Sequence, residues 1–206
     1  MLGPVFSQTV DILLRRAALT MPKTILVNFL LLFLLAANLQ AQEPPVIVMH
    51  RSGAGQRDET GWTDAKSTEG KYSVRLPVVF NDFTMRDPSP NSVIDRLFVI
   101  GALSAEGIKF AATRTTYRAS TDAEPFFKKW KAGNVLRGKE ESRKVSDYQG
   151  FESVDVTGAD DASLYRGKVI LVKSDLFLLM IEAPLSQREL VDKLTPTFFS
   201  SLSFEP

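Results

Sequence analysis

Beyond residue 41, apolar residues are densest in the second of two consecutive β-hairpins, which the pattern predicts between Ser142 and Pro184. The first pairs Ser142–Asp147 with Gly150–Thr157, and the second pairs Leu164–Lys173 with Leu176–Pro184. Short apolar runs of four to eight residues between turn signals are typical of buried strands. We expect the rest of the chain to pack against the second hairpin, since it is the more apolar of the two.

Four earlier segments also have the pattern of strands: Tyr72–Leu76, Asn81–Phe83, Arg96–Leu103 and Ile108–Tyr117. The turn-forming sequence Arg86–Asn91 ends the second of them, because proline, aspartate and serine favour turns. The short polar segment between the last two ends in glycine and predicts a hairpin loop.

Two helices are predicted. Asp122–Arg137 carries Phe126, Phe127 and Trp130 at helical spacing. A second helix is expected to begin at Ser186, with Glu189 completing a capping box.

Pro196 is expected to kink or interrupt this last helix, because proline lacks the backbone donor and crowds the preceding turn. The order strands, helix, strands, helix predicts an α+β fold, in which a mainly antiparallel sheet packs against helices.

The N-terminal part has a different pattern. We interpret residues 1–41 as a leader with a signal peptide, because the apolar core 25–37 follows basic residues. Cleavage after Ala41 is the favoured reading, an uncleaved anchor is the alternative, and Met21 is a second candidate start. Residues 42–61 are interpreted as a flexible linker to a single domain at 62–206, although Val46–Met49 could add an edge strand.

Composition narrows the function classes. The chain has 25 Lys and Arg, 24 Asp and Glu, one His and no Cys. This balance gives no reason to expect nucleic acid or an anionic membrane surface as a partner. The absence of Cys excludes disulfides, thiol catalysis and cysteine metal sites, and export without disulfides suits a bacterial envelope protein.

Several motifs resemble those of PsbP-like domains in exported bacterial proteins. They are the opening stretch Trp62 with Glu69–Pro77, the turn Tyr148–Glu152, and the closing hairpin with Tyr165–Val169 and Leu176–Ile181. The resemblance implies an α/β/α sandwich around a mainly antiparallel sheet. Named members of that wider group are accessory or binding proteins, including an extrinsic subunit of the photosynthetic oxygen-evolving complex. No metal-binding or partner-docking residue of that subunit matches a position here, and nothing indicates photosynthesis.

Candidate chemistry is sparse. His50, the only histidine, falls in the expected linker, where an incidental role is the favoured interpretation. The acidic pairs Glu140-Glu141 and Asp160-Asp161 lack the ligand spacing of a calcium loop. One basic concentration is a candidate docking patch for an acidic partner, against the simpler reading of a solvated helix face: Lys128, Lys129, Lys131, Arg137 and Lys139.

The sequence therefore predicts an exported, non-catalytic binding or accessory subunit of the cell envelope. No catalytic residue, metal or cofactor is predicted. We expect a protein partner in the envelope, no nucleic acid, and membrane contact only through an uncleaved leader. Two alternatives stay open. One is a small-ligand carrier or hydrolase-type enzyme with a cleft between sheet and helices, and the other is a structural domain anchored by an uncleaved N-terminal helix.

Overall fold

The computed structural model describes residues 44–119, 121–133 and 138–205. The expected leader at 1–41 and the patch residue Arg137 lie outside these ranges. The described elements, in chain order, are β1 (Val46–Ala54), β2 (Thr63–Lys66), β3 (Tyr72–Leu76), β4 (Phe80–Arg86), β5 (Ile94–Leu103), β6 (Lys109–Tyr117), α3 (Glu124–Ala132), β7 (Lys139–Tyr148), β8 (Phe151–Ala159), β9 (Ser163–Val172), β10 (Asp175–Pro184), the 3₁₀ turn η1 (Leu185–Gln187), α4 (Arg188–Ser200) and β11 (Ser203–Phe204).

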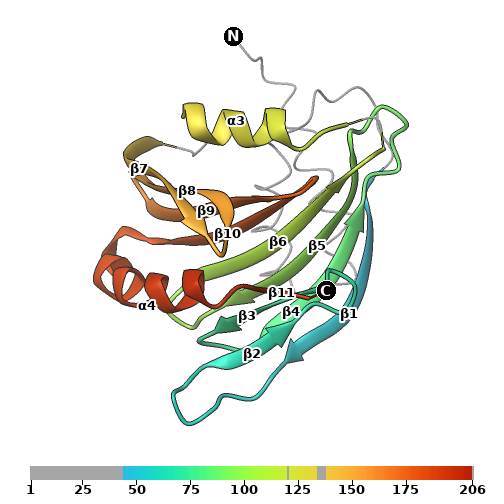
Figure 1. The fold of residues 1–206 in the computed structure, drawn as a ribbon. Coiled ribbons are helices and arrows are strands. Elements are labelled where there is room, and N and C mark those ends of the chain that lie inside the picture. The colour runs from blue at the N-terminus through green and yellow to red at the C-terminus, as the bar shows by residue number, and fades with distance from the viewer. Residues whose placement is uncertain (1–43, 120, 134–137, 206) are drawn as a thin grey trace, which may run out of the picture. The chain divides into compact units, whose positions relative to one another are not determined.

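The strands form two antiparallel sheets. The large sheet has eight strands in the order β1-β4-β5-β6-β10-β9-β8-β7, and the small sheet has three in the order β11-β3-β2 (Figure 1). The predicted α+β class with a mainly antiparallel sheet is confirmed. With two helices in the described part of the chain, the fold is richer in sheet than a balanced α/β/α sandwich.

The two faces of the large sheet carry different layers. Neighbouring residues of β9 point to opposite faces, and Val169 packs with Phe127 of α3, whereas Ile170 belongs to the core under α4. Figure 1 shows α3 and α4 on opposite sides of this hairpin region. The sandwich that the resemblance implied is therefore realised over β8, β9 and β10. Elsewhere the small sheet takes the place of a helix layer.

The main core lies between the large sheet, the small sheet and α4. Burying a large apolar side chain contributes about 1.5–3 kcal/mol each, so this layer is the principal source of stability. Its largest fully buried members are Tyr72, Phe80, Phe110, Phe198, Leu76, Ile100, Ile108, Leu164, Ile170, Leu179 and Ile181.

Both hairpins predicted from the apolar pattern are confirmed, and they are continuous with each other in one sheet. β7 pairs with β8 from Lys139 to Tyr148, and β9 pairs with β10 along their whole length. The first turn is Gln149-Gly150, and both residues have positive φ, 55° and 85°. Two such residues match the two-residue turns whose twist suits a hairpin.

The linker interpretation is wrong for Val46–Ala54, which forms β1 and pairs with β4 at the edge of the large sheet. The alternative that Val46–Met49 adds an edge strand is confirmed, and the strand is longer than that run. The folded part therefore begins before Trp62, and Gln42–Pro206 forms one compact unit. The polar residues after Met49 give no strand pattern in the sequence, because an edge strand such as β1 needs apolar contacts on only part of its surface.

The first predicted helix is shorter than Asp122–Arg137. α3 spans Glu124–Ala132 and ends at Gly133, whose φ is 104° and whose N–H bonds to the Lys129 carbonyl. Glycine adopts such a conformation without the steric cost that other residues bear, so the helix stops at the first glycine it meets.

The last helix begins two residues later than predicted and without the expected capping box. Leu185–Gln187 forms a 3₁₀ turn, and α4 starts at Arg188 with no side-chain cap bond. The turn follows directly on β10, whose end at Pro184 fixes the direction in which the chain leaves the sheet.

Of the two effects expected of Pro196, interruption of the helix does not occur, since α4 runs through it to Ser200. A kink stays a prediction. Phe198 and Phe199 are both buried in the main core and hold the last turn against the sheet. The hydroxyl of Thr195 also donates to the Val191 carbonyl at 2.7 Å. Packing of this kind outweighs the loss of one helical hydrogen bond.

Candidate functional site

The basic patch predicted from the sequence is interleaved with carboxylates. On α3, Lys128 bonds to Glu124 at 2.9 Å, which raises the pKa of the lysine, and Lys131 bonds to Glu152 at 2.5 Å. Lys129 lies 5.7 Å from the centre of the Phe126 ring. The described lysines therefore do not form a uniformly positive surface.

The remaining described member of the patch, Lys139, is exposed at the start of β7, opposite Ala159. Glu140, beside it, forms an ion pair with Arg143, and Glu141 accepts two hydrogen bonds from Arg188 of α4. This pairing lowers the pKa of Glu141. A docking role for Lys128, Lys129, Lys131, Arg137 and Lys139 stays a prediction.

His50 lies in β1 and not in a linker. Its Nε2 is 2.8 Å from the Thr84 hydroxyl, which donates to Glu69 at 3.1 Å, and Nε2 is 3.9 Å from the same carboxylate. The three side chains come from β1, β4 and the turn between β2 and β3. The histidine thus joins the edge of the large sheet to the small sheet.

The neighbouring Asp82 is fully buried and holds the same turn. Its carboxylate accepts hydrogen bonds from the Thr68 N–H at 2.7 Å, from the Thr68 hydroxyl and from the Ser67 hydroxyl. A buried carboxylate is tolerated when it accepts several such bonds. Sequence reasoning missed Asp82, because nothing in the sequence distinguishes it from the exposed aspartates.

The acidic pair Asp160-Asp161 lies at a turn, as the spacing suggested. Asp160 accepts hydrogen bonds from the N–H groups of Ala162 and Ser163 at 2.9 and 2.8 Å, and from the Tyr165 hydroxyl at 2.7 Å. Within the described residues, no group of three His, Cys, Asp or Glu is placed to hold a metal ion.

A buried arginine links α4 to β9, which the sequence did not indicate. Nε and one terminal nitrogen of Arg166 donate to Asp192 at 3.0 and 2.9 Å, and the other terminal nitrogen donates to the Tyr165 carbonyl at 3.0 Å. Glu141 is 3.6 Å away. Paired in this way, the arginine fixes the position of α4 on the sheet.

A buried lysine lies on the same face. Nζ of Lys168 is 2.6 Å from Asp155 and lies 5.4 and 5.8 Å from the ring centres of Tyr148 and Phe199. An ammonium over aromatic faces and beside a carboxylate is well compensated for its loss of water. This group, like Arg166, is accounted for by its packing role.

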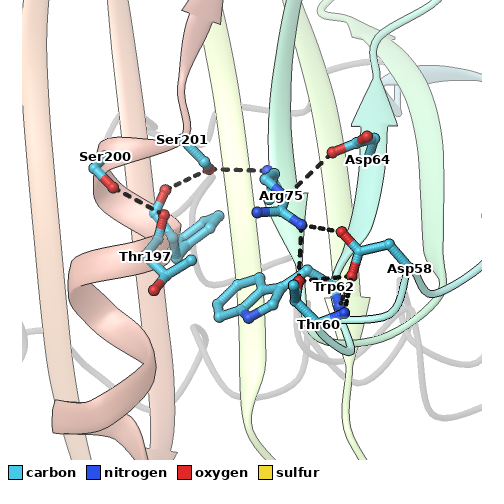
Figure 2. A network of polar contacts seen from close by, with 9 residues as sticks. Asp58, Thr60, Trp62, Asp64, Arg75, Thr197, Ser200 and Ser201 are labelled. Carbon is cyan, nitrogen blue, oxygen red and sulfur yellow. Dashed lines mark hydrogen bonds and ion pairs between the residues drawn. The ribbon is translucent and has the colours of Figure 1, made fainter.

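A polar network joins the β2–β3 region to the end of α4 (Figure 2). The guanidinium of Arg75 pairs with Asp58 and Asp64, and its backbone N–H donates to the Ser201 hydroxyl at 2.8 Å. Ser201 in turn donates to the Phe198 carbonyl at 2.7 Å. The strand β3 is thereby tied to the last turn of α4.

Asp58 organises the turn that precedes β2. Its carboxylate accepts hydrogen bonds from the Thr60 hydroxyl at 2.7 Å and from the N–H groups of Thr60 and Trp62 at 2.8 and 3.0 Å. These bonds, the Thr60 hydroxyl first, lower the pKa of Asp58 to about 2, and Arg75 adds a smaller effect of the same sign.

We expect Thr60→Ala to raise the pKa of Asp58 from about 2 towards its ordinary value of 3.8. Arg75→Gln should raise it by less, because the charge of Arg75 is the smaller cause. Carboxylate ¹³C chemical shifts followed from pH 1.5 to 6 measure both values. A larger shift in Arg75→Gln than in Thr60→Ala would contradict this order.

The same network should make stability depend on pH in a defined direction. Because the folded-state pKa lies below the unfolded one, Asp58 stabilises the fold above about pH 4, and this contribution disappears as pH falls through about 2. Asp58→Asn should therefore be less stable than the natural protein at pH 6 and equally stable below pH 2.

Exposed large apolar side chains of the described residues gather on one strand. Val46, Val48 and Met49 of β1 are exposed, whereas the other examples are scattered singly over the described surface. We call the residues Val46–Met49 the β1 edge. Their pairing with β4 is regular, and β1 is the terminal strand of the large sheet. The signal in the sequence was the run Val-Ile-Val-Met.

The opposite edge of the large sheet has a different character. Six of the ten residues of β7 are charged, and Val145 is its one exposed large apolar residue among those described. Charged side chains on an edge strand oppose pairing with another chain. The β1 edge lacks this protection.

No helix in the described ranges is long and apolar enough to span a membrane.

Among solved structures, the chain is similar to a cyanobacterial protein. The solution structure of cyanobacterial PsbP (CyanoP) from Synechocystis sp. PCC 6803 is 12% identical to this chain with a TM-score of 0.47, and the match covers 74% of this chain and 98% of that chain. It belongs to the group that the sequence resemblance indicated. A comparison with protein-family models gave no match, and neither did a comparison with curated proteins.

Proposed function

We propose that this chain is a non-catalytic binding domain that joins another protein through the β1 edge. The observation that carries the proposal is the exposed run of apolar residues on a terminal strand. Half of the backbone N–H and C=O groups of such a strand point away from the sheet and offer hydrogen bonds to an extended segment. Main-chain bonds of this kind supply affinity in strand addition, and alternate side chains supply specificity.

The packing of the interior supports binding at the protein surface over a ligand-binding or catalytic site in a cleft. The layer between the two sheets and α4 is filled by aromatic and aliphatic side chains, and the Tyr72 hydroxyl and the Asp82 carboxylate at its border are hydrogen-bonded within the fold. The alternative of a carrier or hydrolase-type enzyme needs a hollow between sheet and helices. The packing of Tyr72, Phe110 and Phe198 occupies that space.

We further propose that the domain works as an accessory subunit of the cell envelope. The apolar core 25–37, preceded by basic residues, supports an exported location. The absence of cysteine supports a fold that needs no disulfide after export.

The test is site-specific photocrosslinking in the organism that produces the chain. A photoreactive residue at Val48 is expected to give a protein adduct, and the same residue at Val145 is the control, because both valines lie on edge strands and are about half exposed, 50% and 48%. Mass spectrometry identifies the adduct. Absence of any protein adduct at position 48, or equal adducts at both positions, would refute binding through the β1 edge.

The basic residues of α3 provide a second comparison. Charge reversal at Lys128, Lys129 and Lys131 should leave crosslinking at position 48 unchanged, because α3 packs on β8 and β9 at the other end of the strand order. Loss of the adduct on this reversal would move the docking surface to the patch predicted from the sequence.

A further inference from the structure

We propose that the partner at the β1 edge is a second copy of this chain, paired antiparallel with the first about a two-fold axis near Val48. This inference rests on the proposed function, since it names the partner of the same surface. A two-fold axis makes the contact isologous, so each copy offers the other the same strand and the assembly closes as a dimer.

The side chains of the β1 edge are complementary to themselves in this arrangement. A pairing centred on Val48 places Val48 opposite its own copy and Ile47 opposite Met49. Both pairs keep their side chains on matching faces of the combined sheet, as the period of two requires. Cross-strand neighbours of this kind lie roughly 4.5–5.5 Å apart at Cβ, close enough for apolar contact.

Features at both ends of the β1 edge limit the pairing between the two copies to the register centred on Val48. Pro44 and Pro45 precede the strand and have no N–H to donate, and the first irregularity in the pairing with β4 falls between Met49 and Arg51. In a pairing centred on Val48, Pro45 of one copy faces Arg51 of the other. The prolines thus face the bulged part of the strand, and the regular pairing is confined to the residues between them.

Charge also favours self-pairing at the β1 edge over self-pairing at β7, the opposite edge of the large sheet. Val46–Met49 carries no charge, so two copies meet without repulsion. At β7, six charged residues lie on the strand, and four of them, Lys139, Glu141, Lys144 and Asp147, are exposed. A mixed contact between β1 and β7 would continue indefinitely along the sheet, whereas the β1 pair closes.

The experiment is sedimentation velocity over a wide range of concentration, on protein purified from cells that produce the full chain. We expect reversible dimers. Val48→Lys should weaken dimerisation roughly fivefold or more, because it places two like charges directly opposite each other. Val145→Lys is the matched control and should leave the dimer unchanged.

A charge-complement pair tests the two-fold axis itself. An equimolar mixture of Val48→Lys and Val48→Glu should dimerise more tightly than either variant alone, because lysine then faces glutamate. Far-ultraviolet circular dichroism and the thermal midpoint of each variant check that the half-exposed position accepts the new side chain.

Each other outcome overturns the inference in a recognisable way. A natural protein that stays monomeric at all concentrations excludes the second copy, and an adduct with a different protein at position 48 would then leave the proposed function standing. Growth into long polymers excludes the closed dimer, and sensitivity to Val145→Lys places the contact elsewhere. Monomers without any adduct at position 48 refute both proposals.

Discussion

Replacing Phe198 by alanine is expected to lower the free energy of unfolding by about 4 kcal/mol, within the usual range for a buried phenylalanine. Phe198 is fully buried, and its ring meets that of Phe110 edge-on at 5.6 Å between centres. It lies in the last turn of α4 within the main core, where its removal leaves a cavity among packed side chains. Chemical denaturation measures the loss.

Lys193→Ala is the control on the same helix. Its side chain is exposed, so the free energy of unfolding should change by no more than about 0.5 kcal/mol. A loss below about 1.5 kcal/mol in Phe198→Ala would mean that α4 is not a main part of the core.

Tyr72→Phe, which removes one oxygen atom, is expected to lower the free energy of unfolding by roughly 2–4 kcal/mol. The fully buried hydroxyl lies 2.6 Å from the Ala112 carbonyl and 3.2 Å from the Phe98 carbonyl, and accepts the Ile100 N–H at 3.1 Å. Phenylalanine would leave a backbone donor and a backbone acceptor unpaired inside the protein. Burial, with the nearby Asp82, raises the pKa of Tyr72 well above its ordinary value, so the group stays neutral.

Tyr148→Phe provides the comparison for Tyr72→Phe. The Tyr148 hydroxyl donates to the Leu202 carbonyl at 2.9 Å, but the residue is only partly buried, so water can replace the lost bond. We expect a loss of about 1 kcal/mol. Equal losses in the two variants would show that the Tyr72 hydroxyl is not the link between the small sheet and strands β5 and β6.

The Tyr72 hydroxyl also affects the proposed binding surface, the β1 edge. Tyr72 belongs to β3, and the turn before it carries Glu69, which reaches the Thr84 hydroxyl beside His50 of β1. Weakening the small sheet removes support from one face of the edge strand. Tyr72→Phe should therefore increase hydrogen exchange in Val46–Met49 more than Tyr148→Phe does.

The sequence predicts only part of the candidate site. The run Val46–Met49 indicates a possible edge strand, but the polar residues around it favour a linker. The same interpretation assigns His50 to the linker. A strand at the end of a sheet needs only one neighbour, so its polar half carries little periodic signal. The sequence shows the lysines of α3 as a run of positive charge. Glu152, which pairs with Lys131, comes from strand β8 and is distant in the chain.

The sequence by itself determined the two central hairpins, the strands from Tyr72 to Tyr117, the apolar stripe of the first helix and the antiparallel α+β class. These features depend on residues close together in the chain, through turn chemistry and through periods of two or 3.6. Only the tertiary structure decided that β1 joins the large sheet, that β11, β3 and β2 form a second sheet, and that α4 continues through Pro196. Those outcomes depend on contacts between distant segments, such as Tyr72 with Ala112 and Phe198 with Phe110, whose energy exceeds the local preferences that the sequence displays.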